Sequence, residues 1–413
     1  MTAKPLNTLS AQRYKVLLAG VCSQLLCVGV ARFAYTPLLP VMQEQAGMSD
    51  ALGGWLAALN YLGYMLGAVL ASLIGDIRLK DTLFRIGLVL ALMTTAGMAL
   101  SDDVWLWASM RFLAGLSSSA SMLLASGLIL HWLLQHRQRG ELGIHFAGLG
   151  VGIVISALAV EAMMRASFGW QAQWWGFALV SLVLLFPAWV WLPRPYVSRV
   201  SVATKAAPAS RPPSATFMRL MFAAYFCAGY GYVISATFIV VIVERLPGLS
   251  GMGNLVFALV GVSAAITVML WDLVARRIGY LGALIMAMAL QVVGILLPAL
   301  TSSLIGVLIS ALLYGGTFLG CVSLVLTMAG RLYPASPAKL MGKLTLAYGA
   351  AQILAPALTG SLAEATGHYA VGLWLAAGLV LCGALLLVWL RQVDQTAQRL
   401  DAEAKALRSG QAS

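Results

Sequence analysis

Long apolar stretches alternate along the chain with short polar segments. About 20 consecutive apolar residues are enough for an α-helix to cross the hydrocarbon core of a bilayer. The pattern predicts twelve membrane-spanning helices, at residues 14–39, 51–75, 82–100, 104–134, 142–165, 170–193, 216–246, 252–275, 279–300, 303–330, 338–365 and 369–391. The predicted fold is therefore an all-α membrane protein.

The composition excludes a soluble protein. Charged residues make up 10% of the chain and hydrophobic residues 61%, whereas soluble domains average about 25% and about 45–50%. With the N-terminus placed in the cytoplasm, 22 of the 26 lysines and arginines fall on the cytoplasmic side of the predicted spans. This is the positive-inside pattern, and an even number of spans puts both termini in the cytoplasm. The net charge of +12 therefore reflects topology and does not indicate a nucleic-acid partner.

Four prolines, four basic residues and no acidic residue mark the segment after the sixth predicted helix as a linker. Weak repeats at an offset of 200 residues, such as Gly29 with Gly229 and Cys27 with Cys227, predict two pseudo-symmetric six-helix bundles. The predicted organisation is an N-terminal bundle at 1–193, a cytoplasmic linker at 194–215, a C-terminal bundle at 216–393 and a cytoplasmic tail at 394–413.

Two local motifs sharpen the assignment. WDLVARRIG (Trp271–Gly279) is similar to the Asp/Arg–Gly loop motif of the major facilitator superfamily, and RFLAGLSSSAS (Arg111–Ser121) is similar to its helix-four Arg-x-x-x-Gly motif. The segments GVARFAYTPLLPVM and YGAAQILAPALTG resemble the YbfB/YjiJ-type branch of bacterial transporters within that superfamily. The resemblance implies the superfamily fold, secondary transport by alternating access, a bacterial inner-membrane location and no cofactor. It does not name a substrate.

Arg32 is the one charged residue between Val16 and Leu39. It lies eight residues, about 12 Å, from Pro40 at the predicted helix end. A charged residue at that depth costs roughly 2.5–3.5 kcal/mol on insertion scales, so Arg32 should face the bundle interior. One interpretation is a counter-charge for an anionic substrate; the other is a structural arginine bound to carbonyl groups or to Glu44.

Arg111 lies at a similar predicted depth in the fourth helix. Two buried arginines with few acids nearby indicate a site attractive to negative charge, whereas the resemblance implies a role in proton handling and a structural pairing is the third alternative. Tyr35, three residues after Arg32, should lie on the same helix face and contribute to an aromatic and cationic pocket.

Other polar or aromatic residues within the spans are candidates to line a substrate cavity. They are Asn60, Tyr61, Tyr64, Tyr230, Tyr232, Tyr314, Tyr348 and Gln352. The alternative for each is an interhelical hydrogen bond, worth about 0.6 kcal/mol on average in membranes.

Candidates for coupling and gating are sparse. Glu161 is a possible proton carrier, although Arg165 at i+4 favours a surface ion pair. The resemblance implies that Asp76 and Asp272 bridge to loop arginines such as Arg276 and Arg277 and gate the cytoplasmic face. Three histidines, His131, His136 and His145, are expected in the solvated interface at that face, and a role in proton coupling is the alternative, since histidine titrates near neutral pH.

The hypotheses that remain are all of membrane function. The first is a secondary carrier of small organic anions or zwitterions, with protons as a candidate coupling ion; the second is an efflux carrier of amphipathic compounds in which the arginines are structural. A membrane sensor or enzyme is a remote alternative, since the chain has no P-loop, GxSxG or HExxH motif and no cysteine pattern with metal-ligand spacing. The expected partners are a small-molecule substrate and the lipid bilayer, with no obligate protein partner and no metal or cofactor.

Overall fold

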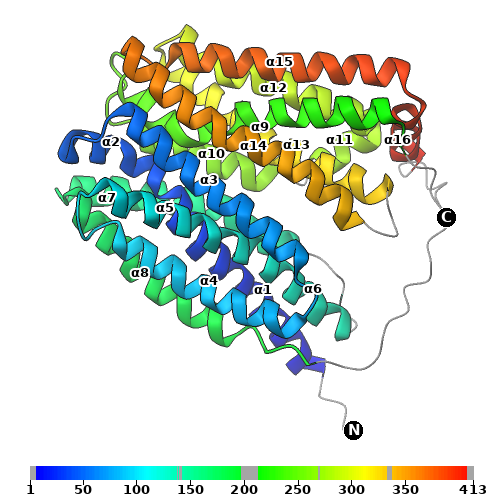
Figure 1. Cartoon of the computed structure of the whole chain (residues 1–413), viewed down its shortest axis with the longest axis horizontal. Helices are drawn as coiled ribbons and strands as arrows, with labels where there is room; N and C mark the ends of the chain where they lie inside the picture. Colours follow the sequence, from blue (N-terminus) through cyan, green and yellow to red (C-terminus); the bar gives the residue numbers. More distant parts are fainter. Residues whose placement is uncertain are drawn as a thin grey trace. The chain divides into compact units, whose positions relative to one another are not determined.

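The computed structural model describes residues 6–136, 138, 142–196, 213–267, 270–332 and 337–406. These residues form helices and no strand (Figure 1). Ten of the described helices are long and apolar enough to span a membrane, and the bent pair Gly253–Thr267 and Leu270–Ile278 would make eleven. The expected all-α membrane fold is confirmed. The expected count of twelve spans is not reached when helices are counted by length and apolar composition.

The expected span at 82–100, the third along the chain, corresponds to α4 (Ile77–Gly97) and does not meet this measure. Its 21 residues rise about 31 Å, enough to cross the hydrocarbon core. Its first nine residues, however, include Arg78, Lys80, Asp81 and Arg85, so charged side chains extend over its first two turns. These charged residues lie in the first turns of α4, and the residues after Arg85 carry no charge.

Contacts divide the chain into two compact units, Met1–Gly47 with Leu59–Ser201 and Met48–Ala58 with Val202–Ser413. The helices of the first unit are α1 (Leu6–Gln24), η1 (Leu25–Phe33), α2 (Tyr35–Ala46), α3 (Asp50–Leu73), α4, α5 (Val104–Ser119), η2 (Ala120–Ala125), α6 (Ser126–Gln135), α7 (Gly143–Arg165) and α8 (Trp170–Val190). Helix α3 is shared, because its first turns are grouped with the second unit.

The second unit is built around one central helix. Its helices are α9 (Ala215–Glu244), α10 (Gly253–Thr267), α11 (Leu270–Ile278), α12 (Tyr280–Leu300), α13 (Leu304–Leu332), α14 (Pro337–Thr366), α15 (Ala370–Val393) and α16 (Gln395–Ala406). Helix α9 packs against α10, α12, α13, α14 and α15. In its most apolar stretch, 94% of the residues are buried. A helix that is apolar all round is stable only when neighbours surround it or lipid bathes it.

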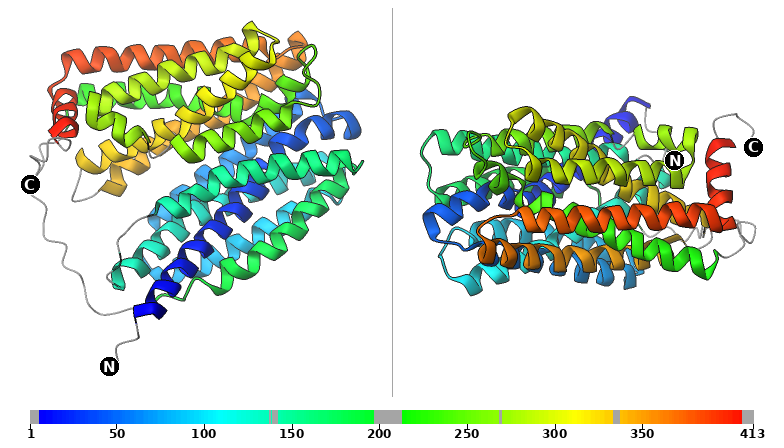
Figure 2. Two further views of the ribbon diagram at one scale, coloured as in Figure 1. Left: turned by 180° about the vertical axis from the view of Figure 1, so that it is seen from behind. Right: turned by 90° about the horizontal axis from the view of Figure 1, so that it is seen from above.

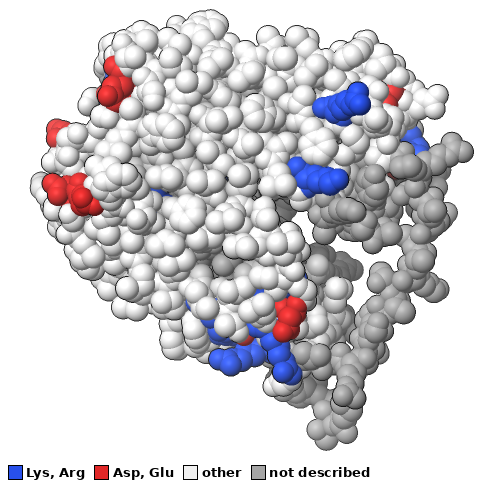
Figure 3. Space-filling model, in the orientation of Figure 1, with Lys and Arg blue, Asp and Glu red and all other residues white. Residues whose placement is uncertain are grey.

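Outer helices keep apolar side chains on their exposed faces. On α8, Leu179, Val183 and Phe186 are each more than 60% exposed. The face drawn in Figure 3 is white over the middle of the helices, with charged side chains near helix ends. An apolar exposed surface of this extent suits contact with acyl chains.

The predicted linker, 194–215, lies largely outside the described residues, which cover only 194–196 and 213–215 of it. The predicted tail, 394–413, contains the helix α16, and residues 407–413 are outside the described part. The sequence predicts this segment only as a cytoplasmic tail, without a helix. In the structure α16 crosses the ends of α11 and α12 (red in Figure 2).

Asp394 begins α16 and ties it to the second unit. Its carboxylate accepts hydrogen bonds from the backbone N–H groups of Thr396 (2.7 Å) and Ala397 (3.2 Å), as an N-cap does. The Ser214 hydroxyl, at the N-cap of α9, donates to the same carboxylate. Burial alone would raise the pKa of Asp394, but these hydrogen bonds outweigh burial and lower it.

Asp401 holds the middle of α16 against the loop between α11 and α12. Its carboxylate accepts from the backbone N–H of Leu281 (2.8 Å) and from Arg391 Nε (2.7 Å), and Arg391 also donates to the Ile278 carbonyl (3.2 Å). Gly279 has φ +93°, and a Cβ there would lie 2.3 Å from Asp401 Cγ. Only glycine combines this backbone conformation with this close approach.

We expect Asp401→Asn to lower the free energy of unfolding by about 1–3 kcal/mol, because the buried carboxylate is the acceptor for two donors. The measurement is the melting temperature of the detergent-purified full-length protein. Glu403→Gln is the matched control on the same helix, since Glu403 is 45% exposed and lies 3.8 Å from Arg399. Equal melting temperatures for the two variants would contradict the role given to Asp401.

Candidate functional site

The first unit has a π-helical stretch, η1 (Leu25–Phe33), at its centre. A π-helix bonds each N–H to the carbonyl five residues earlier, as Ala34 N–H does to the Gly29 carbonyl at 3.0 Å. Side chains of neighbouring helices donate to carbonyls of this stretch: Ser118 to Cys27 (2.8 Å), Ser156 to Gly29 (2.9 Å) and Arg111 to Ala31 (3.0 Å). The irregular backbone at the centre of the unit is therefore satisfied by α5 and α7.

Arg32 lies inside the first unit and is 8% exposed. Its guanidinium carbon is 4.4 Å from the ring centre of Tyr61, 4.8 Å from that of Tyr64 and 5.6 Å from that of Phe33. Aromatic faces stabilise a desolvated cation by about 2 kcal/mol or more. Aromatic faces at these distances are attracted to the positive charge of an arginine.

Arg111 has a different environment from Arg32. It is 3% exposed, and its guanidinium donates to the Ala31 carbonyl and lies 3.5 Å from the Arg32 carbonyl. The Tyr35 ring centre lies 4.2 Å from its guanidinium carbon. Of the three interpretations of Arg111, the structural one is the one for which the described contacts supply partners.

Tyr35 was expected on the helix face of Arg32, and the structure places its ring beside the Arg111 guanidinium. The expectation assumed 3.6 residues per turn. The π-helix ends at Phe33 and Ala34 is a turn residue, so the three-residue spacing from Arg32 to Tyr35 crosses a change in helical period. That change rotates the tyrosine away from the direction that a regular helix would give.

Glycines let α3 and α5 approach closely enough to place Asn60 and Tyr61. A Cβ at Gly115 would lie 1.9 Å from the Asn60 carbonyl oxygen, and a Cβ at Gly63 would lie 2.0 Å from that of Phe112. Because the two backbones lie this close together, the Asn60 side chain reaches the Arg111 carbonyl and donates a hydrogen bond to it (2.9 Å). Asn60 thus makes the interhelical hydrogen bond that was the alternative to lining a cavity.

The second unit contains a cluster of stacked aromatic rings. Tyr232 stacks on Phe318 and Tyr348 at centroid distances of 5.1 and 5.9 Å, and Tyr225 lies 4.5 Å from Tyr348. The Tyr314 hydroxyl donates to the Tyr232 carbonyl at 2.8 Å, and its ring stacks on Phe318. The cluster joins three of the predicted tyrosines from α9, α13 and α14.

Two further predicted residues lie near this cluster in sequence. These are Gln352 on α14, four residues after Tyr348, and Tyr230 on α9, and both side chains are buried. Whether any of these side chains contacts a substrate stays a prediction.

A buried polar cluster that sequence reasoning missed surrounds His145. The expectation of a solvated histidine is wrong for this residue, which is fully buried. Its Nε2 lies 3.0 Å from both Gln24 Nε2 and Ser126 Oγ. Gly20 leaves room for the ring, because a Cβ there would lie 2.5 Å from His145 Nδ1. The signal in the sequence was Gln24, a polar side chain in the middle of the first apolar stretch.

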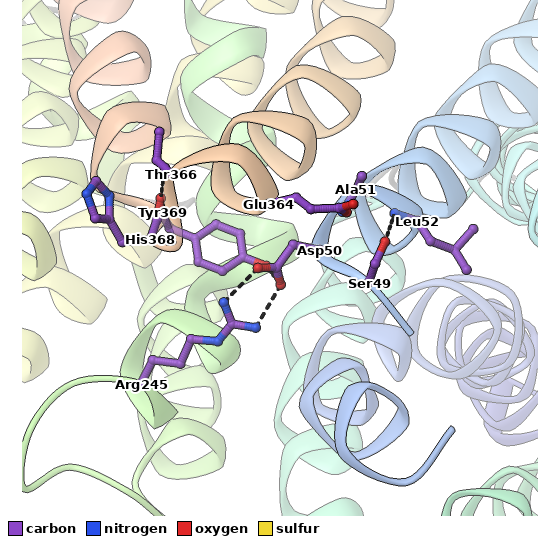
Figure 4. A network of polar contacts seen from close by, with 9 residues as sticks. All are labelled: Ser49, Asp50, Ala51, Leu52, Arg245, Glu364, Thr366, His368 and Tyr369. Carbon is purple, nitrogen blue, oxygen red and sulfur yellow. Dashed lines mark hydrogen bonds and ion pairs between the residues drawn. The ribbon is translucent and has the colours of Figure 1, made fainter. Parts of the chain in front are cut away.

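A second group that was missed lies at the start of α3, in the part counted with the second unit (Figure 4). Arg245 donates two hydrogen bonds to the Asp50 carboxylate (2.7 and 2.8 Å), and the Tyr369 hydroxyl donates a third (2.7 Å). The bond to Asp50 raises the pKa of Arg245. Glu364 accepts from the Ala51 N–H at 2.9 Å.

Close backbone contact accompanies this group. A Cβ at Gly360 would lie 2.4 Å from the Asp50 carbonyl oxygen, and a Cβ at Gly54 would lie 2.2 Å from that of Pro356. Asp50, Arg245 and Tyr369 all stand at ends of predicted spans on one side of the membrane. That coincidence was the signal available in the sequence.

The predicted coupling and gating residues lie at helix ends. Glu161 pairs with Arg165 at 2.8 Å, and the Arg165 side chain is 79% exposed. Asp76 caps the start of α4 by accepting a hydrogen bond from the Arg78 backbone N–H (2.8 Å). Asp272 pairs with Arg276 within α11 (2.7 Å). Arg277 is exposed on the same helix.

A family model described as "Uncharacterised MFS-type transporter YbfB" matches residues 24–388. The match covers most of the chain. It contains the rings around Arg32, the ring cluster of the second unit and the His145 cluster. The chain belongs to this family. The resemblance inferred from the helix-one and helix-eleven motifs is therefore confirmed.

Curated relatives of this YbfB-type chain are MFS-type transporters. The YceJ transporter of Bacillus subtilis is 28% identical over 172 residues, 40% of this chain and 41% of YceJ. The niacin transporter NiaP of Acinetobacter baylyi is 24% identical over 143 residues, 35% of this chain and 31% of NiaP. The matched stretch thus spans about a third to two-fifths of the curated relatives' length.

Solved structures share the fold. The nucleoside transporter NupG has a TM-score of 0.72 at 13% identity, covering 92% of this chain and 98% of NupG. A D-xylose–proton symporter has a TM-score of 0.71 at 15% identity, covering 91% and 97%. At this identity the likeness establishes the fold and no substrate.

We expect Gly115→Ala to destabilise the YbfB-type fold by about 1–3 kcal/mol, because the added methyl group meets the α3 backbone. Gly127→Ala is the control: among the described residues, no atom beyond the adjacent backbone of its own helix lies within 4 Å of its Cβ position. Alanine also favours a helix over glycine by up to about 1 kcal/mol. Melting temperature and the monodisperse fraction in size-exclusion chromatography are the measurements. A tolerated Gly115→Ala would show that α3 and α5 are not packed as described.

Proposed function

We propose that this protein is a secondary active transporter of small organic solutes that carry negative charge, working by alternating access. Family membership supports transport of a small molecule. The observation that carries the anion preference is the Arg32 guanidinium, buried in the first unit against the rings of Tyr61 and Tyr64.

Two guanidiniums, those of Arg32 and Arg111, are buried in one low-dielectric region of the first unit. Arg111 lies within hydrogen-bond distance of the Arg32 backbone, so two positive groups belong to the same part of the unit. Electrostatic interactions are much stronger there than in water. An anion near them relieves their mutual repulsion, and a guanidinium can bind a carboxylate with two parallel hydrogen bonds.

The chain's relatives are compatible with a carboxylate. One of them is named as a niacin transporter, and niacin is a small aromatic carboxylic acid. Tyr61 and Tyr64 beside Arg32 offer aromatic faces together with the positive charge. We therefore propose that small carboxylates, including aromatic ones, are the substrate class to test.

We expect a panel of carboxylates, each paired with its uncharged amide, to separate the two transport hypotheses. A bound carboxylate should raise the melting temperature of the purified protein by mass action, and its amide should not. Arg32→Ala should weaken that binding about 10- to 100-fold through loss of a charge-assisted hydrogen bond. Arg32→Lys, which keeps the charge without the planar fork, should be intermediate.

Arg165→Gln is the control, since it removes an exposed arginine of the same unit. Uptake of the best carboxylate into proteoliposomes then tests transport itself. If Arg32→Ala retains full affinity and transport, the anion-binding role is wrong. The efflux carrier of amphipathic compounds, to which the ring cluster of the second unit is suited, would then be the better hypothesis.

We further propose that transport is coupled to protons through His145. Imidazole is the side chain that titrates nearest neutral pH, and this one is buried in hydrogen-bond contact with Gln24 and Ser126. Glu161 is the weaker candidate, because its partner Arg165 is a surface residue.

In proteoliposomes with an imposed pH gradient, uptake of the identified carboxylate should respond to the gradient. His145→Gln should remove the response while leaving exchange of labelled for unlabelled substrate intact. His368→Gln, at an exposed position, is the control. Loss of the response in Glu161→Gln instead would assign coupling to Glu161, and no response in the unmodified protein would exclude proton coupling.

The charge distribution supports the orientation that we propose, with both termini in the cytoplasm of a bacterial-type cell. Most lysines and arginines stand at the ends of helices on the side assigned to the cytoplasm.

A further inference from the structure

A groove of about 410 Å³ lies on the outer surface of the first unit, along α4 and the end of α8. The two helices pack side by side (Figures 1 and 2). The part of the groove toward the middle of α4 is apolar and open: Ile86, Val89 and Met93 line it and are 55%, 41% and 61% exposed. None of the transport roles proposed above uses these residues.

The charged end of the groove is rigidly built. Asp81 and Arg85, one turn apart on α4, form an ion pair at 3.1 Å in which each side chain is 8% exposed. Arg85 also donates to the Trp189 carbonyl (2.6 Å) and the Leu192 carbonyl (3.1 Å), which lie at the end of α8 and just beyond it. The guanidinium therefore fixes the end of α8 against the start of α4.

A positive charge remains at this end. Asp81 balances Arg85, and Arg194, which also lines the groove, is exposed. Within the described part of the chain Arg194 makes no ion pair. Trp189 lines the same end, with its ring 5.1 Å from the Arg85 guanidinium carbon. A tryptophan beside a basic side chain is typical of the level of lipid headgroups.

We propose that this groove binds one anionic phospholipid, with the phosphate at Arg194 and an acyl chain along Ile86, Val89 and Met93. The lining residues of α4 recur every three or four positions and so form one helix face, charged at its start and apolar beyond. From Ile86 to Met93 this face rises about 10 Å, within the roughly 15 Å depth of one leaflet. Basic pockets between spanning helices bind anionic lipid headgroups in this way.

The test measures the melting temperature of the full-length protein in detergent during titration with dioleoylphosphatidylglycerol or dioleoylphosphatidylcholine. The anionic lipid should stabilise the protein at lower concentration than the zwitterionic one. Arg194→Gln should raise the midpoint of the anionic titration about fivefold, the effect of one basic residue near a membrane surface. Arg219→Gln, which removes an exposed arginine at the start of α9, should leave the midpoint unchanged.

Val89→Trp tests the acyl part of the groove. This exposed position tolerates a larger side chain, and the indole should occupy the groove and weaken binding while Arg194 is intact. sn-Glycerol 3-phosphate, the soluble part of the ligand, should not stabilise the protein at matched concentration.

Three results would overturn the proposal: equal stabilisation by both lipids, an equal effect of Arg194→Gln and Arg219→Gln, or full protection by sn-glycerol 3-phosphate. Native mass spectrometry of the unmodified protein gives an independent count that needs no variant. One phosphatidylglycerol should remain bound at collision energies that remove phosphatidylcholine, and loss of both together would also reject the site.

Discussion

A backbone carbonyl that leaves the regular helical ladder inside a membrane must find a donor within the protein, because lipid supplies none. In the first unit this constraint falls on η1, whose carbonyls receive hydrogen bonds from Ser118, Ser156 and Arg111. The π-helical turn and its donors depend on each other. In a regular α-helix these carbonyl oxygens would accept hydrogen bonds within the helix. Without the donors from α5 and α7, the π-helix would leave buried carbonyls without a partner, which is destabilising.

This arrangement separates the two arginines that look alike in sequence. Arg111 is bound to the carbonyl groups of η1, and its own carbonyl is bound by Asn60. Arg32 stands on η1 itself and presents its guanidinium to tyrosine rings. One arginine therefore holds the irregular helix in place, and the other carries the charge on which the proposed anion preference depends.

Close packing of small residues makes both positions possible. Gly63 and Gly115 bring α3 against α5, which sets Tyr61 and Tyr64 beside Arg32, and Gly29 meets Gly152 between η1 and α7. At the polar ends of the helices, carboxylates take over the same task. Asp401 accepts a hydrogen bond from Leu281 and Asp394 accepts one from Ser214, so each ties α16 to another segment. Asp81 pairs with Arg85 on its own helix, and Arg85 in turn holds the end of α8. The chain thus uses glycine where helices cross in lipid and aspartate where they meet water.

The sequence by itself determined the membrane class, the places of most spans, the family and the burial of Arg32. These follow from hydropathy, which is a sum over local residues, and from motifs that are contiguous in the chain. The pairing of side chains could not be derived in the same way. The Tyr35 ring lies beside Arg111, which is 76 residues away in the chain (111 − 35). His145 lies in a buried cluster whose partners are 19 and 121 residues away.

The helix α16 and its buried Asp401 were invisible for a related reason: a polar amphipathic segment becomes a docked helix only where another segment offers donors, here Leu281 and Arg391. Tertiary structure decided these features because they depend on register and on which helices touch, and neither is encoded in the apolar content of a stretch.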